Sequence, residues 1–179
     1  MLKNKLLVVV DYQNDFVDGS LGFERAKQIE PAVCDKISSY ISNGYDVVFT
    51  MDTHPQKYLF TSEGRHLPVK HCIKGTPGWN LHGKVAELAQ GHTLIEKPTF
   101  GGLELARYIE SKNYSEIELC GVVSNICVIS NAVMAKAASP ESEITVDALC
   151  VASNDPDMEQ KAFDIMENLH VRVVNRDKT

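Results

Sequence analysis

Hydrophobic positions along the chain follow two alternating patterns. Continuous apolar runs are typical of strands buried on both faces, and apolar residues at helical spacing lie between them. The predicted strands are residues 5–10, 45–51, 93–96, 116–123, 143–147 and 171–174. The predicted helices are residues 24–43, 81–90, 103–112, 126–138 and 156–169. Alternation of strands and helices predicts an α/β fold: one domain spanning residues 1–179, with a doubly wound, mainly parallel six-stranded sheet covered by helices on both faces.

One segment fits neither pattern. Residues 52–79 are rich in proline, glycine and histidine and have no clear periodicity. Connections of this length are uncommon in a compact domain unless they carry a function. We therefore expect a binding loop here.

Composition narrows the class of protein. With 179 residues and 44% hydrophobic content the chain can bury a core without disulfides. The net charge of −6 and the lack of a basic run interleaved with aromatic residues argue against nucleic-acid binding. The first apolar run is too short to span a membrane and no cleavage site follows it, so a cytoplasmic protein is expected. Five cysteines without a CxxC pair predict reduced thiols.

Residues of reactive type follow four of the predicted strands. Asp11, Asp52, Lys97 and Cys127 each come at or shortly after a strand end. In a parallel α/β sheet, ligands bind beyond the carboxyl ends of the strands, where the strand order reverses. Each residue alone also has a structural explanation, such as a turn aspartate or a surface lysine. Together they predict one site.

Three of these residues form a set suited to nucleophilic attack on an amide. Cys127 lies at the start of a predicted helix, where the helix dipole lowers a thiol pKa, although a buried structural cysteine is the alternative. A neighbouring Lys97 cation stabilises a thiolate, and Asp11 can take the thiol proton and pass it to the leaving amine. Backbone N–H groups at the helix start can bind the oxyanion.

A second group lies in the long loop. Asp52, His54 and His71, with Glu63 between them, offer oxygen and nitrogen ligands. Such ligands suit zinc, iron, manganese or cobalt. Two surface histidines with an acidic cap are the alternative, and Cys72 is another possible ligand.

Five segments, taken together, resemble a known family. They are Asp-Tyr-Gln-Asn-Asp-Phe at 11–16, Asp-Thr-His-Pro at 52–55, His-Cys-Ile-Lys-Gly-Thr-Pro-Gly at 71–78, Glu-Lys at 96–97 and Gly-Val-Val-Ser-Asn-Ile-Cys-Val at 121–128. The chain resembles the isochorismatase-like cysteine hydrolases, and within them the nicotinamidase (pyrazinamidase) type. The resemblance implies a Rossmann-like three-layer fold and hydrolysis of a C–N amide bond.

The resemblance also implies the roles of individual residues. Asp11, Lys97 and Cys127 would be the catalytic triad. The N–H groups of Val123 and Cys127 would form the oxyanion hole, with a cis peptide bond between Val122 and Val123.

A metal site and a substrate pocket are implied in the same way. The ion would be divalent, zinc first and iron or manganese next, with ligands Asp52, His54, His71 and Glu63. The residues expected to contact the substrate are Phe16, Val122 and Phe100. This chain has Pro68-Val69-Lys70 where relatives often carry a tryptophan. The candidates to replace it are Trp79, Phe100, Tyr58 and Phe60.

The expected reaction is conversion of nicotinamide to nicotinate and ammonia through a thioester, in NAD salvage and pyridine nucleotide metabolism. Relatives are commonly oligomeric, so the resemblance also implies a possible homo-oligomer. A metal-independent hydrolase of another small amide, ureide or enol ether is the main alternative, and metal content distinguishes the two. A nucleotide-binding module is less favoured, because residues 11–19 contain no GxGxxG or GxxxxGK[ST]. A non-catalytic scaffold protein is the last alternative.

Overall fold

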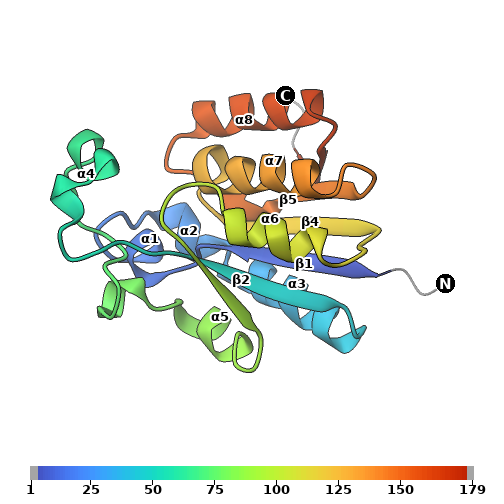
Figure 1. Cartoon of the computed structure of the whole chain (residues 1–179), viewed down its shortest axis with the longest axis horizontal. Helices are drawn as coiled ribbons and strands as arrows, with labels where there is room; N and C mark the ends of the chain where they lie inside the picture. Colours follow the sequence, from blue (N-terminus) through green and yellow to red (C-terminus); the bar gives the residue numbers. More distant parts are fainter. Residues whose placement is uncertain (1–3, 177–179) are drawn as a thin grey trace.

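The continuous apolar runs form one parallel sheet in the computed structural model, which describes residues 4–176 (Figure 1). The sheet order is β3-β2-β1-β4-β5-β6, and every neighbouring pair is parallel. The strands are β1 (Lys5–Val10), β2 (Asp46–Asp52), β3 (Thr93–Lys97), β4 (Glu116–Val122), β5 (Glu143–Ala152) and β6 (Arg172–Val174). The predicted six-stranded α/β fold is confirmed.

Helices cover both faces of this sheet. The helices that cover it are α2 (Glu24–Gln28), α3 (Glu30–Ser42), α5 (Gly83–Leu88), α6 (Leu103–Glu110), α7 (Ile129–Ala138) and α8 (Pro156–Asn168). Helices α6, α7 and α8 pack on one face, and α2, α3 and α5 pack on the other (Figure 1). In β1, Leu6, Val8 and Val10 face the first layer while Leu7 and Val9 face the second. All five side chains are fully buried, which explains why β1 is apolar throughout rather than alternating.

Two predicted elements differ from the structure. The helix predicted at residues 24–43 is two helices, α2 and α3, because Pro31 lies in the first turn of α3. Proline lacks the N–H that a continuous helix would need and its ring clashes with the preceding turn. The strand predicted at residues 143–147 continues to Ala152, with a bulge beside β4 that moves the register between Leu119 and Gly121. The apolar run from which the strand is predicted stops at the polar Asp147, and the bulge carries the strand past this residue.

The long loop contains short structured pieces. They are η1 (Tyr58–Phe60), α4 (Ser62–His66) and η2 (Pro77–Trp79), and a further short helix, α1 (Asn14–Val17), follows β1. Figure 1 shows α4 projecting at the end of the molecule where β1 and β2 terminate. Within residues 4–176, no helix combines the length and the apolar character that crossing a membrane requires.

The strand order reverses at β1. From β1 the chain proceeds through β2 and β3 to one side of the sheet, whereas β4, β5 and β6 extend it on the other side. Helices on opposite faces leave a crevice at such a point, beyond the carboxyl ends of the strands. The predicted reactive residues lie at this end.

Candidate active site

Asp11 directly follows β1 and turns away from the strand. Its φ of 46° is in the left-handed region, which aspartate tolerates better than most residues. The carboxylate is fully buried, and Oδ1 accepts a hydrogen bond of 2.7 Å from the Thr50 hydroxyl on neighbouring β2. The other oxygen, Oδ2, receives no hydrogen bond of good geometry from the described residues. Oδ2 instead faces the Lys97 ammonium.

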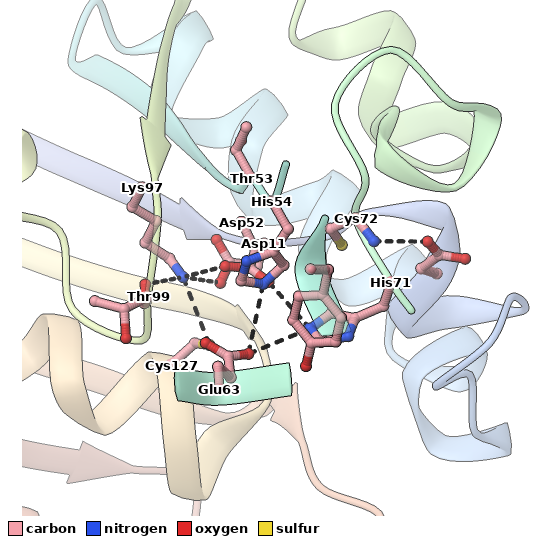
Figure 2. A network of polar contacts seen from close by, with 12 residues as sticks. Asp11, Asp52, Thr53, His54, Glu63, His71, Cys72, Lys97, Thr99 and Cys127 are labelled. Carbon is pink, nitrogen blue, oxygen red and sulfur yellow. Dashed lines mark hydrogen bonds and ion pairs between the residues drawn. The ribbon is translucent and has the colours of Figure 1, made fainter. Parts of the chain in front are cut away.

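Lys97 is the last residue of β3 and lies beside Asp52 in the sheet register. Its ammonium forms an ion pair with Asp11 Oδ2 at 2.6 Å, although the angles are not those of a hydrogen bond. The same ammonium lies 3.7 Å from Cys127 Sγ. Nζ also donates to the Thr99 carbonyl at 2.9 Å, and only 1% of the side chain is exposed (Figure 2). The structure thus brings Asp11, Lys97 and Cys127 together, although they are far apart in sequence.

Cys127 belongs to a π-helical turn, η3 (Ser124–Val128), which leads directly into α7. The peptide bond between Val122 and Val123, just before this turn, is cis, as the resemblance implied. Asn131 in the first turn of α7 donates to the Cys127 carbonyl at 2.8 Å. The cysteine therefore lies where the chain changes from strand to helix, at the bottom of the crevice.

The thiol is not depressed in pKa, contrary to the prediction from its position at a helix start. Burial, together with the negative charge of Asp11, raises the pKa of Cys127 well above its usual range, and Lys97 only partly opposes this. Burial also raises the pKa of Asp11, against the lowering effect of Lys97. A proton that moves from Cys127 to Asp11 leaves the net charge of the three groups unchanged. Such a transfer can form the thiolate without bringing a new charge into the buried site.

The predicted metal ligands converge on the other side of Lys97. Asp52 Oδ2 lies 2.9 Å from His54 Nε2 and 3.4 Å from His71 Nε2. Glu63 Oε1, from α4, lies 3.4 Å and 3.5 Å from the same two nitrogens (Figure 2). Ligands about 2.0–2.2 Å from a zinc ion lie roughly 3–3.5 Å from one another. The four side chains therefore fit a divalent metal, and Cys72 is not part of this group.

The four side chains of this cluster also contact one another directly. Burial lowers the pKa of both histidines, but hydrogen bonds to Asp52 and Glu63 outweigh this effect. They raise the pKa of His54 to about 9 and that of His71 to about 10. Burial raises the pKa of Glu63, but hydrogen bonds from both histidines lower it to about 2. His71 Nδ1 donates to the Val69 carbonyl at 2.8 Å, which directs Nε2 toward the carboxylates. This orientation is the one that metal-binding histidines adopt.

A cavity of about 220 Å³ connects the two groups. Its walls are mainly apolar, with Asp52, Glu63 and His71 at the metal cluster and Cys127 at the nucleophile. The remaining lining residues are Phe16, Leu21, Phe23, Leu67, Phe100, Val123, Ile126 and Asn154. Two of the three residues predicted to contact substrate, Phe16 and Phe100, are among them.

Val122 is the exception. Its side chain is fully buried in the core beneath the crevice, and Val123 takes the place in the cavity wall. Successive side chains of an extended chain point in opposite directions, so a shift of one residue separates core from cavity.

Leu67 stands near the position where relatives often carry a tryptophan. It lines the cavity, as does Phe100, whereas the other candidates lie elsewhere. Trp79 donates from Nε1 to the Thr53 hydroxyl, Tyr58 is fully buried against both cluster histidines, and the Phe60 side chain is 81% exposed. The cavity therefore has an aliphatic wall at this point.

Sequence reasoning missed one supporting residue at the centre of the site. Gln13, two residues after Asp11, accepts from the Asp52 N–H at 2.7 Å and donates to the Asp52 carbonyl at 2.9 Å. The same amide donates to the Trp79 carbonyl at 2.7 Å. A buried glutamine thus fixes the backbone of a predicted metal ligand. A polar residue just past a buried strand was the available signal, but its partners are distant in sequence.

Comparison with known proteins gives a consistent result. The isochorismatase domain family matches residues 5–178. A Bacillus subtilis protein described as an uncharacterized isochorismatase family protein is 36% identical over 141 residues, covering 72% of this chain and 76% of that protein. The crystal structure of nicotinamidase/pyrazinamidase from Bacillus subtilis has a TM-score of 0.86 and 30% identity, covering 95% of this chain and 98% of its own. Pyrazinamidase of Pyrococcus horikoshii in complex with zinc has a TM-score of 0.84 and 27% identity, with coverages of 97% and 99%.

Proposed function

Because this chain belongs to the isochorismatase family, we propose that it is a metal-assisted cysteine amidohydrolase that converts nicotinamide to nicotinate and ammonia, a step of NAD salvage. The coarser activity, hydrolysis of an amide bond, follows from its nicotinamidase relatives. One observation carries the finer proposal. A single cavity has a thiol with its lysine and carboxylate on one side and a cluster of metal-ligand type on the other.

The first half of the reaction forms a thioester. The Cys127 proton passes to Asp11, and Sγ attacks the carboxamide carbon while the carbonyl electrons move to oxygen. The N–H groups of Val123 and Cys127 stabilise this oxyanion. Asp11 then protonates the nitrogen, the C–N bond breaks and ammonia leaves. Lys97 keeps the charge of the thiolate and carboxylate balanced throughout.

The second half restores the enzyme. Asp11 takes a proton from water, whose oxygen attacks the thioester carbon. The C–S bond breaks as Asp11 returns this proton to the sulfur, and the acid product leaves as nicotinate after losing its remaining proton to solvent. Asp11 thus acts in turn as base and acid in both halves, as its buried position beside Lys97 permits.

The other side of the cavity orients the substrate. An ion held by Asp52, His54, His71 and Glu63 would supply a coordination point for the pyridine nitrogen, with zinc the first candidate and iron or manganese next. Phe16 packs on His71 with a ring distance of 5.5 Å and is suited to flank an aromatic substrate. Holding the ring at one end directs the carboxamide to Cys127 at the other.

Ammonia release from nicotinamide tests the proposal. Purified protein supplied with zinc is expected to release ammonia, and Cys127→Ala is expected to release none. Cys34→Ala is the matched control, because Cys34 is also buried but lies in α3, away from the cavity. Absence of activity in the wild-type protein with zinc, iron and manganese would show that the nicotinamide assignment is wrong.

Metal content distinguishes the proposal from its rival, a metal-independent hydrolase of another small amide, ureide or enol ether. We expect about one divalent ion per chain by elemental analysis, and its loss in His54→Ala. Treatment with a chelator is expected to abolish turnover, and added zinc to restore it. An active enzyme free of metal would favour the rival.

A further inference from the structure

A buried polar network lies behind the turn that carries Cys127. The Ser124 hydroxyl, at the start of η3, is fully buried and donates to Glu159 Oε2 at 2.7 Å. Glu159 Oε1 lies 2.5 Å from Arg25 Nη1. Three elements that are distant in sequence therefore meet here: η3, the first turns of α8, and α2. The reaction steps described above use none of these three side chains.

Glu159 is a carboxylate that is almost completely buried, which is unusual for a charged side chain. Its side chain is only 4% exposed, whereas that of Arg25 is 41% exposed. Removing a carboxylate from water is costly, and one partly exposed ion pair does not readily recover that cost. A carboxylate at this buried position therefore needs a specific partner. Inside the protein, the Ser124 hydroxyl is the group that donates to it.

Ser124 is well placed to control the turn. It lies between Val123 and Cys127, whose N–H groups are the proposed oxyanion donors. The turn is wide, because Val128 N–H donates to the Val123 carbonyl at 3.1 Å, five residues back. π-helical turns are rare and frequently lie at functional sites. A side-chain anchor at its first residue therefore fixes the direction of the N–H groups.

We infer that Glu159 is a positioning residue that acts through Ser124 to hold the oxyanion-binding turn in place. Arg25 orients the Glu159 carboxylate and joins it to α2. Phe23, the residue before α2, lines the cavity, so the network also links one wall of the substrate pocket to the nucleophile turn. This inference rests on the proposed function, since it assigns a purpose to the turn in amide hydrolysis.

Three variants test it. Ser124→Ala and Glu159→Ala are expected to lower kcat for nicotinamide by about 10- to 100-fold, the range that a small misplacement of reacting groups produces. KM and metal content are expected to stay within about twofold of wild type, because the cavity walls and metal cluster are not changed. Ser124→Thr keeps the hydroxyl and is expected to recover most of the activity. Glu167→Ala, also on α8 but paired with Arg176 at the surface, is the matched control.

Two reactions of Cys127 separate positioning from general damage. Pyridine-3-carbaldehyde adds to the thiol and forms an oxyanion, whereas alkylation by iodoacetamide forms none. We expect Ser124→Ala to lose aldehyde affinity by about tenfold or more while alkylation stays within about twofold of wild type. Equal loss in both reactions, or unchanged kcat and aldehyde affinity, would overturn the inference. A wild-type protein that neither hydrolyses nicotinamide nor binds the aldehyde would instead contradict the proposed function.

Discussion

Lys97 is the cation shared by both halves of the site. Its ammonium lies 2.6 Å from Asp11 Oδ2, 3.7 Å from Cys127 Sγ and 3.6 Å from Asp52 Oδ1. Burial lowers its pKa, but the charges of Asp11, Cys127 and Asp52 raise it above the usual range, so Lys97 stays protonated. One residue therefore balances the charge of the nucleophile and contacts the metal cluster.

Lys97→Met is expected to reduce kcat/KM for nicotinamide by about 10³-fold or more, because the thiolate and Asp11 lose their cation in a buried site. Steady-state ammonia release measures the effect. Lys74→Met is the matched control, since Lys74 is 59% exposed and pairs with Glu96 at the surface. A Lys97→Met variant with more than a tenth of wild-type activity would contradict the assigned role.

Gln13→Ala tests the support of the metal cluster. The change removes three hydrogen bonds and leaves the N–H and carbonyl of Asp52 without their partner. We expect the free energy of unfolding to fall by about 2–4 kcal/mol and zinc to be retained less well during dialysis. Urea unfolding and elemental analysis measure these effects. Gln28→Ala, at an exposed site on α2, should change neither quantity.

At the scale of elements, the contact between β1 and β4 is unusually close. Gly121 has a φ of 106°, and a Cβ atom at this position would lie 2.1 Å from the Val10 carbonyl oxygen. Both features require glycine. The residue lies on the strand that leads into the Cys127 turn.

Gly121→Ala is therefore expected to destabilise the protein by about 3 kcal/mol or more and to reduce activity in the fraction that folds. Thermal unfolding and ammonia release per folded molecule measure the two effects. Gly44→Ala provides the comparison, because Gly44 also has positive φ, but among residues 4–176 no atom beyond its chain neighbours lies within 4 Å of its Cβ position. It should cost only about 1 kcal/mol. Equal effects at the two sites would show that the close approach to Val10 is unimportant.

The sequence predicts the regular elements well where apolar side chains set the pattern. Five of the six strands end within one residue of the predicted end, whereas β5 continues five residues further. The convergence of Asp11, Lys97 and Cys127 follows from the parallel sheet. What could not be predicted depends on contacts between distant segments. The Gln13 contact with Asp52, the place of Leu67 in the cavity wall and the raised pKa of Cys127 all require the depth and direction of side chains, which periodicity does not contain.

At the scale of the whole molecule, a second, partly buried charge cluster joins β4 and β5 to α3. Lys36 Nζ lies 2.6 Å from Asp147 on β5 and 2.6 Å from Glu118 on β4. Burial raises the pKa of Asp147, but hydrogen bonds from Lys36 and Asn175 outweigh this effect and hold the pKa below its usual value. The cluster therefore makes stability depend on pH.

The sign of this dependence follows from the lowered pKa. Asp147 contributes stability above its unfolded-state pKa of about 4, and this contribution disappears as pH falls through the lower folded-state pKa. Asp147→Asn is expected to cost about 1–3 kcal/mol at pH 7 and much less at pH 3, as measured by urea unfolding. Glu143→Gln, an exposed partner of Arg172 on the same strand, should cost less than about 1 kcal/mol at either pH. A cost for Asp147→Asn that is equal at both pH values would contradict the ion-pair explanation.

The position of β1 in the middle of the sheet has a consequence for how the protein matures. β1 precedes β2 in the chain and pairs with it early, but its other edge waits for β4, where Lys5 meets Glu116. Closing so long a stretch of chain is entropically costly, so this seam is expected to form late. Asp11 follows β1 and Cys127 follows β4. In a nascent or refolding chain, the two catalytic side chains therefore come together only when β1 pairs with β4.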